Sequence, residues 1–484
     1  MDKLLGFAPD ADPTTPGVIT SATNFIPYQN GMMGAPTGQN PLGVPALSAA
    51  CHGATVVEKL DATRRIIAGT TSKLYELSSG SWSDVSKAGG YTGGSDTAWS
   101  FAQFGDATLA ANGVDKIQRS TTGAFASISS APIAQIVFSV GSFVMALDTS
   151  VATYGDQSDR WWCSASYDDS DWTPALSTLC TTARLVSSPG PITAGGRLGE
   201  YAVVYKKKAI YLGQYVGAPS VWDFIQVPGG EAGCIGKNAW CYIGSAHFIV
   251  GSDNFYLFDG TRPAAIGTGI VREWFFANAE PTLLYKVKCV FDRRTNSVWV
   301  FYPAVGSTVC NQAIVYHIGT ERWGHCTVTI EAALDYTTSG VTIDTMNTVE
   351  VTIDEFTDYV FDSQFWLSGA RALSIVNDSH QLQLMTGSTT SSGFTTGDVG
   401  DDEATSLLRK IRIRFAPGYQ PTASVQMYSK QVEGDSLTTR GSGTMTDGKI
   451  DVLQSARFHR ASFTFTGPAR VLAVGMDLKA GGIF

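Results

Sequence analysis

Acidic and aromatic side chains crowd into one stretch of the chain, DRWWCSASYDDSDWTP at residues 159–174. It holds three tryptophans and four aspartates, namely Asp159, Asp168, Asp169 and Asp171. Clustered carboxylates can bind a metal ion, and two at a defined separation can cleave a glycosidic bond. Near-adjacent acids in a turn are more often solvated or bonded to the local backbone. We therefore interpret the stretch as a structural turn, with Arg160 and the aspartates exposed or paired with neighbours.

The rest of the sequence offers little further chemistry. The eight cysteines form no CxxC pair, and we interpret them as reduced thiols, most of them buried. Six histidines are dispersed, and His247 and His317 lie inside apolar strand patterns, as core histidines do. No nucleophile-elbow, zinc-protease, P-loop or dinucleotide-binding motif is present. We expect no catalytic residue, no metal and no cofactor, and we expect that the protein is not an enzyme.

Composition narrows the class of protein. The chain has 484 residues, of which 44% are hydrophobic and 16% charged, with 51 glycines, a composition that favours β-structure. No apolar run is long enough for a membrane span or a signal peptide, so we expect a soluble protein made in a cytoplasm. The formal net charge of −9 argues against tight binding to nucleic acid phosphates.

Short strand patterns recur along the chain with an aromatic residue near the end of each group. These closing aromatics are Trp82, Phe125, Trp172, Trp222 and Trp323. Consecutive members are roughly 40 to 50 residues apart, except that the last interval is about twice as long. This spacing is typical of propeller blades of four strands. Six units are predicted, at residues 54–88, 98–130, 134–175, 198–227, 238–268 and 285–327. A seventh is indicated by ALSIV and LQLMTG within 372–387, and Trp172 is expected to pack between blades.

The predicted fold is all-β: a β-propeller of six or seven antiparallel blades plus a small C-terminal β-sandwich. An unrelated array of β-sandwiches is the alternative. The predicted parts are an extended N-terminal arm that contributes to propeller closure (1–53), the blades (54–327), an acidic insert with a possible last blade (328–403) and the antiparallel sandwich (404–484). Residues 391–405 have the composition of a linker.

Charge is unevenly distributed. Residues 323–370 contain eight acids and no lysine or arginine, whereas the C-terminal part is basic. We predict a contact between subunits in which Asp354, Glu355 and Asp358 meet Arg409, Arg412 and Arg414. The basic face could instead meet DNA phosphates or remain solvated. Lys206, Lys207 and Lys208 are predicted at a hairpin tip, as a charged turn or as a phosphate contact.

Five stretches, in order, resemble tail structural proteins of short-tailed bacteriophages; they lie at residues 10–38, 159–174, 204–236, 341–387 and 457–482. The first reads DADPTTPGVITSATNFIPYQNGMMGAPTG, and the last reads RFHRASFTFTGPARVLAVGMDLKAGG. Cys163 and Ser164-Ala165-Ser166 depart from the plainer W-S of the family pattern. SYDDSDW also resembles a degenerate Asp-box, a turn motif of sialidase-like propellers, with Ser170 in place of the usual glycine.

The resemblance implies a propeller subunit of the head-closure or tail-nozzle type in the virion. Such subunits form a ring, usually a homohexamer, below the portal adaptor and beside needle or fibre proteins. The ring lines a channel, retains the packaged genome and passes double-stranded DNA without sequence-specific binding or catalysis. An acidic lumen suits this role, because it repels DNA.

A rival interpretation is a carbohydrate-binding or sialidase-like propeller that recognises a receptor. Trp161, Trp162 and Trp172 could stack on sugar rings if exposed, so their burial would argue against it. A propeller scaffold for protein partners is a third interpretation, with only the fold to support it.

Overall fold

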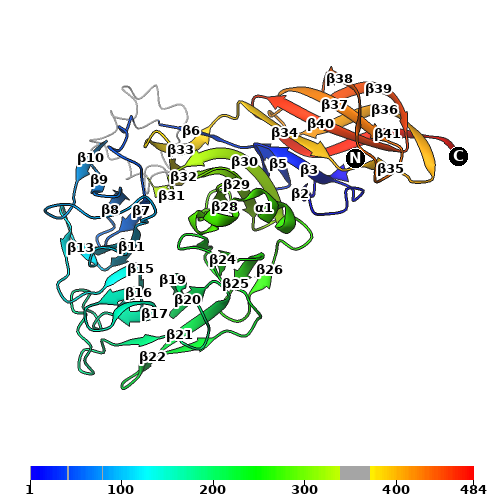
Figure 1. The fold of residues 1–484 in the computed structure, drawn as a ribbon. Helices are drawn as coiled ribbons and strands as arrows, with labels where there is room; N and C mark the ends of the chain where they lie inside the picture. Colours follow the sequence, from blue (N-terminus) through cyan, green and yellow to red (C-terminus); the bar gives the residue numbers. More distant parts are fainter. Residues whose placement is uncertain (1, 41–42, 79, 338–370, 484) are drawn as a thin grey trace.

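The computed structural model describes residues 2–40, 43–78, 80–337 and 371–483. These residues form an all-β protein in two parts, a ring of blades and a sandwich beside it (Figure 1). The helical elements among them are α1 (Arg272–Asn278) and the 3-10 helix η1 (Pro281–Lys286). No helix in this part of the chain has the length and apolar character needed to cross a membrane.

Six separate four-stranded antiparallel sheets form blades of the propeller, and five of these consist of strands consecutive in sequence. Those five are β7 (Gly53–Glu58), β8 (Arg64–Gly69), β9 (Leu74–Ser78) and β10 (Ser81–Asp84); β11 (Ser100–Phe104), β12 (Ala107–Ala111), β13 (Gln118–Ser120) and β14 (Ala126–Ser127); β15 (Ile133–Val140), β16 (Phe143–Val151), β17 (Gly155–Cys163) and β18 (Thr182–Arg184); β19 (Ile192–Leu198), β20 (Tyr201–Lys206), β21 (Ala209–Gly217) and β22 (Val221–Gln226); and β23 (Trp240–Tyr242), β24 (His247–Val250), β25 (Phe255–Phe258) and β26 (Ala264–Ala265).

The N-terminal arm supplies a strand to the sixth of these sheets. That sheet contains β31 (Ala332–Thr337), β32 (Arg371–Val376) and β33 (Leu382–Gly387), and β6 (Thr37–Gln39) is its fourth strand. The register places Gly38 opposite Met385. A further meander of β27 (Lys288–Asp292), β28 (Ser297–Tyr302), β29 (Cys310–His317) and β30 (Arg322–Ile330) stands in the ring as one end of a larger sheet. The described residues therefore give seven four-stranded units, and the predicted propeller is confirmed.

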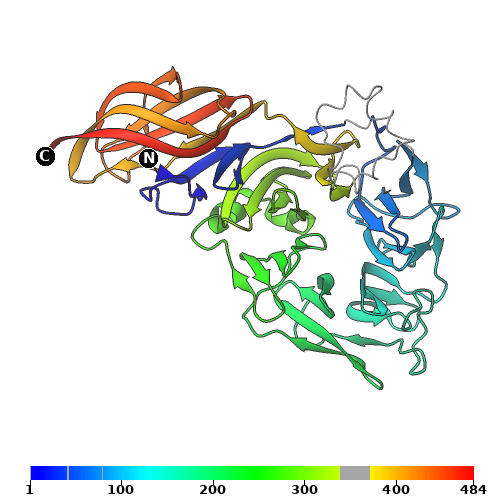
Figure 2. The same ribbon diagram turned by 180° about the vertical axis from the view of Figure 1, so that it is seen from behind.

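Burial explains why these segments become strands. Inner strands have neighbours on both faces, so their residues are apolar without strict alternation. All residues of β12 and β28 are buried. The first strands of neighbouring units contact one another, and β31 returns to β7, which closes the ring (Figure 2). Closure leaves few exposed sheet edges.

Two sheets packed face to face form the sandwich. One contains β41 (Arg470–Ile483), β36 (Ala404–Phe415) and β39 (Lys449–Ala456), with β1 (Asp2–Lys3) beside β41. The other contains β2 (Gly6–Phe7), β3 (Val18–Thr23), β34 (Ser391–Thr396), β40 (Phe458–Thr466), β37 (Thr422–Lys430) and β38 (Thr438–Thr444), with β35 (Val399–Gly400) beside β40. Ile411 and Phe463, from opposite sheets, are buried in one apolar cluster. The predicted C-terminal sandwich is present.

The linker predicted at residues 391–405 is wrong for its first half. β34 occupies residues 391–396 and pairs with β3 and β40 inside the sandwich. Serine, threonine and glycine gave the segment the composition of a linker. However, the buried Phe394 ring lies 4.9 Å from Phe25 and 5.0 Å from Phe463, measured between ring centroids. One aromatic anchor in a polar strand is enough to join the core.

The propeller and the sandwich share a ten-stranded sheet. From β30 it continues through β4 (Phe25–Tyr28) and β5 (Gly31–Gly34) to β41. Gly324 in β30 permits the junction, because a Cβ there would lie 2.6 Å from the Cα of Ile26. The two parts are thus joined by backbone hydrogen bonds of one sheet rather than by a linker alone.

Candidate functional site

The tryptophan-rich stretch at residues 159–174 closes the blade formed by β15 to β18. Trp161, Trp162 and Trp172 are all buried, Trp172 completely. The Trp162 indole N–H donates to the carbonyl of Trp172 at 3.1 Å, and the Trp172 indole N–H donates to the carbonyl of Asp169 at 2.9 Å. Trp172 shares an apolar cluster with Ala102 and Leu109 of the preceding blade. The predicted packing of Trp172 between blades is confirmed.

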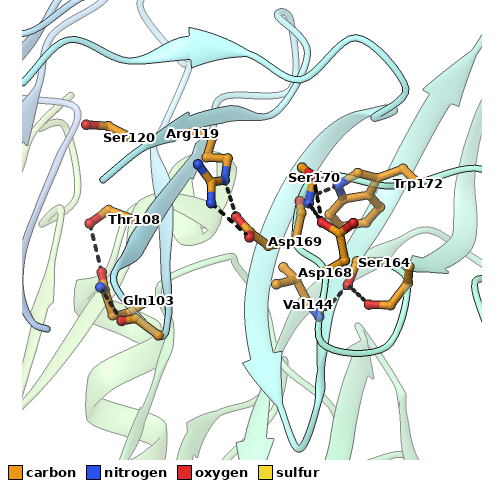
Figure 3. Close-up of polar contacts among 12 residues, drawn as sticks. Gln103, Thr108, Arg119, Ser120, Val144, Ser164, Asp168, Asp169, Ser170 and Trp172 are labelled. Carbon is orange, nitrogen blue, oxygen red and sulfur yellow. Dashed lines mark hydrogen bonds and ion pairs between the residues drawn. The ribbon is translucent and has the colours of Figure 1, made fainter. Parts of the chain in front are cut away.

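Asp168 and Asp169 of this stretch have separate partners (Figure 3). Asp169 accepts from Arg119 Nε at 2.6 Å and from its Nη2 at 3.2 Å, so it joins two blades. Asp168 accepts from the backbone N–H and the hydroxyl of Ser170 at 2.8 and 2.6 Å, which lowers the pKa of its carboxyl. Because the carboxylates diverge toward different partners, they do not form a metal or acid–base pair.

The remaining polar groups of the stretch are also engaged. Asp159 forms a bidentate pair with Arg184 at 2.8 and 2.9 Å, and these bonds lower the pKa of Asp159. Arg160 lies over the Tyr154 ring, 4.1 Å from its centroid. Ser164, where the sequence departs from the phage pattern, is buried and accepts from the backbone N–H of Val144 at 3.1 Å. The stretch is a structural turn, as the sequence indicates.

The three consecutive lysines 206–208 lie in different environments. Lys207 and Lys208 form the exposed turn between β20 and β21, as predicted, and Lys208 pairs with Glu231 at 2.6 Å. Lys206 was expected beside them at the surface, which is wrong: its exposed fraction is 1%. Its ammonium donates to the carbonyls of Leu185 and Ser188 at 2.6 and 2.7 Å. A lysine held by two backbone carbonyls in the interior is not available to a partner.

The predicted basic row lies on β36, where Arg409, Arg412 and Arg414 are exposed. A register irregularity between Leu408 and Lys410 explains why these exposed arginines do not follow one strict two-residue period. Arg409 pairs with Asp477 of β41 at 3.0 Å. Arg412 and Arg414 have no ion pair with any residue that the structure describes. Their predicted partners Asp354, Glu355 and Asp358 lie outside the described residues.

A further polar site lies where the blades meet. A cavity of about 820 Å³ is lined by residues near the first strands of the blades, among them Lys237, Lys286 and Lys288. Sequence reasoning missed these lysines. The signal available was their position in two consecutive units of the repeat, shortly before β23 and shortly before or at the start of β27. Within residues 2–40, 43–78, 80–337 and 371–483, no group of histidine, cysteine or acidic residues is arranged for a metal ion.

Comparison with known proteins gives no family. No protein-family model matches the chain, and no curated protein matches it. Among solved structures, it is similar to YCF48 bound to D1 peptide, with 10% identity and a TM-score of 0.35 over 59% of this chain and 86% of that one. It is also similar to YCF48 from Cyanidioschyzon merolae, with 12% identity and a TM-score of 0.27 over 56% of this chain and 97% of that one. Its similarity to apo AztD from Citrobacter koseri has 10% identity and a TM-score of 0.29 over 57% of this chain and 89% of that one. We draw no conclusion about function from likenesses this low.

Proposed function

We propose that this protein is a structural subunit of the tail of a short-tailed bacteriophage. In this proposal copies of the chain form a ring, a homohexamer, that acts as a tail nozzle or head-closure hub. The ring lines the DNA channel, retains the packaged genome and passes it during ejection. It contacts the portal adaptor on one side and needle or fibre proteins on the other. The protein is not an enzyme and requires no cofactor.

The observation that carries this proposal is the sheet shared by the propeller and the sandwich. A ring subunit must hold its two contact surfaces at a fixed angle, because a heterologous interface closes only if each copy is rotated by the same amount. The two parts are joined by strand pairing of β30 with β4, at His325 and Phe25, and of β41 with β5, at two residue pairs. Linked domains with a small interface would be expected to move relative to each other.

The exposed arginines on β36 support a contact between neighbouring subunits. Arg412 and Arg414 lie on the solvent face of the sandwich and lack ion pairs within the described residues. The chain as a whole is acidic, with a net charge of −9, so another copy offers complementary charge. An acidic chain also suits a conduit through which DNA slides without being held. The resemblance of five ordered sequence stretches to phage tail proteins agrees with this role.

Charge reversal tests the proposal. The double variant Arg412→Glu, Arg414→Glu should shift the protein from ring to monomer in native mass spectrometry, because like charges would then face each other across the interface. Arg262→Glu is the matched control, since Arg262 is an exposed arginine on the propeller. Rings of unchanged mass in the double variant would refute this contact.

The alternative function, receptor binding through sugar stacking, was suggested by three tryptophans that are not exposed. Trp161, Trp162 and Trp172 are buried, so their rings are not available to stack on a sugar. We therefore do not propose carbohydrate recognition by this turn.

A further inference from the structure

Two adjoining cavities lie where the first strands of the propeller units meet. The smaller cavity, about 300 Å³, is lined by the first strands of all seven units. The larger cavity, about 820 Å³, shares Lys237, Asn238 and Lys288 with it and is lined by the segments that enter these strands. We call this larger cavity the axial mouth. Several blades converge there, so side chains from distant parts of the sequence face one space.

Two lysines span the axial mouth. Lys237, just before β23, donates to the carbonyl of Ala98, just before β11, at 2.5 Å. Lys286, just before β27, pairs with Asp96 in the same loop at 2.9 Å. In the order of the ring, at least two units separate β11 from β23 and β27 in either direction. These lysines therefore cross the axis rather than pair within a blade.

Positive charge at the axial mouth is incompletely balanced. A lysine ammonium has three donors, and Lys237 and Lys288 each make one hydrogen bond to a backbone carbonyl among the described residues. The lining carboxylates have partners other than the Lys237 and Lys288 side chains. Asp96 pairs with Lys286, while Glu331 accepts from the Cys51 backbone N–H at 2.8 Å and contacts His380 at 2.7 Å.

The local electrostatics favour an anion at this mouth. Burial lowers the pKa of Lys237 to about 7, and the negative charge of Asp148 opposes this shift without cancelling it. An oxyanion at hydrogen-bond distance would favour the charged amine and use its free donors. Asp96 shows that a carboxylate is accommodated at this mouth. Beside the lysines, Tyr285 and Val309 line the cavity with exposed fractions of 44% and 48%.

We propose that the axial mouth binds a small organic oxyanion, a carboxylate or a phosphate monoester, whose anionic group contacts Lys237 and Lys288 and whose apolar group lies on Tyr285 and Val309. This proposal does not rest on the proposed ring contact, because none of the exposed arginines on β36 lines the axial mouth.

Calorimetric titration of the purified full chain tests the site, with phenyl phosphate, benzoate and inorganic phosphate as probes and benzyl alcohol as the uncharged control. We expect saturable binding of phenyl phosphate or benzoate at about 1 mM or below. The stronger of the two identifies the anionic group, and inorganic phosphate should bind more weakly because it lacks the apolar part. Absence of saturable binding by every anion would overturn the proposal.

Variants locate the site. Lys237→Met and Lys288→Met should each weaken binding by about tenfold or more, as expected for a lost charge-assisted hydrogen bond. Lys207→Met, at the exposed turn, should bind as the unchanged protein does. Equal binding by all three variants would show adventitious association and overturn the proposal.

A second measurement uses the unchanged protein, in case the variants do not fold. Acetic anhydride acetylates neutral amines, and peptide mass spectrometry reports the extent at each lysine. Bound phenyl phosphate should slow acetylation of Lys237 and Lys288 several-fold and leave Lys207 unaffected. Equal labelling with and without the probe would overturn the proposal.

Discussion

A buried carboxylate joins several segments of the sandwich, and its removal has a calculable effect. Asp398 lies between β34 and β35 with a side chain that is 0% exposed. It accepts from Arg460 Nε and Nη2, both at 2.8 Å, and pairs with Lys430 Nζ at 2.8 Å. Its backbone N–H donates to the carbonyl of Pro13 at 2.6 Å. One residue thus connects β37, β40 and the N-terminal arm.

Asp398→Asn keeps the shape of the side chain and removes its charge, which leaves Lys430 and Arg460 without their counterion. Breaking a buried ion pair on one side costs about 3–5 kcal/mol. Since each 1.4 kcal/mol is about tenfold in an equilibrium constant, local opening should become roughly 100- to 4,000-fold more frequent. Hydrogen exchange of the β40 amides measures this opening, and it does not require a chain of this size to unfold in one step.

Asp477→Asn is the matched control in the same sandwich. The Asp477 side chain is 46% exposed and pairs with Arg409 at 3.0 Å, so its loss should cost under about 1 kcal/mol. If Asp398→Asn accelerates β40 exchange no more than Asp477→Asn does, then Asp398 does not hold the segments of the sandwich together.

Three further perturbations test other parts of the structure. Trp172→Ala should destabilise the propeller by about 3–5 kcal/mol in urea unfolding, because it empties a fully buried site, whereas the exposed Leu176→Ala should change little; equal effects would contradict the packing. Burial lowers the pKa of His247 to about 4, so folding stability should fall as the pH drops from about 6.5 toward 4, since only the unfolded chain takes up the proton there. His247→Gln should flatten that part of the profile of melting temperature against pH, and an unchanged slope would contradict the assignment. Gly324→Val should force β4 away from β30 and expose the junction to limited proteolysis; a junction that stays resistant would refute the close approach of these strands.

Local patterns in the sequence predicted the repeated units well, because each blade is a meander of strands close in sequence. The units predicted at 54–88 and 98–130 coincide with β7 to β10 and β11 to β14. The predicted packing of Trp172 between blades was correct, because a large aromatic at the repeat spacing is buried where blades stack. The same local reasoning recognised the aspartates beside it as turn residues.

Long-range contacts escaped prediction for physical reasons. β6 pairs with β33 and β34 with β3, and nothing local to either strand records a partner more than 300 residues away. Lys206 belongs to a run of three lysines, a pattern that predicts exposure. It is buried instead, because two carbonyls from another loop accept hydrogen bonds from its ammonium. The axial lysines are separated by many residues and converge only because the ring closes, so the candidate oxyanion site could not be found from spacing.

Ring formation is the central claim, and direct imaging tests it. Native mass spectrometry with negative-stain electron microscopy of the purified chain, over a range of concentrations, reports both the number of copies and the shape of the assembly. We predict a closed ring of six copies with a central hole wide enough for duplex DNA. A protein that stays monomeric at every concentration, or an assembly without such a hole, would contradict this prediction.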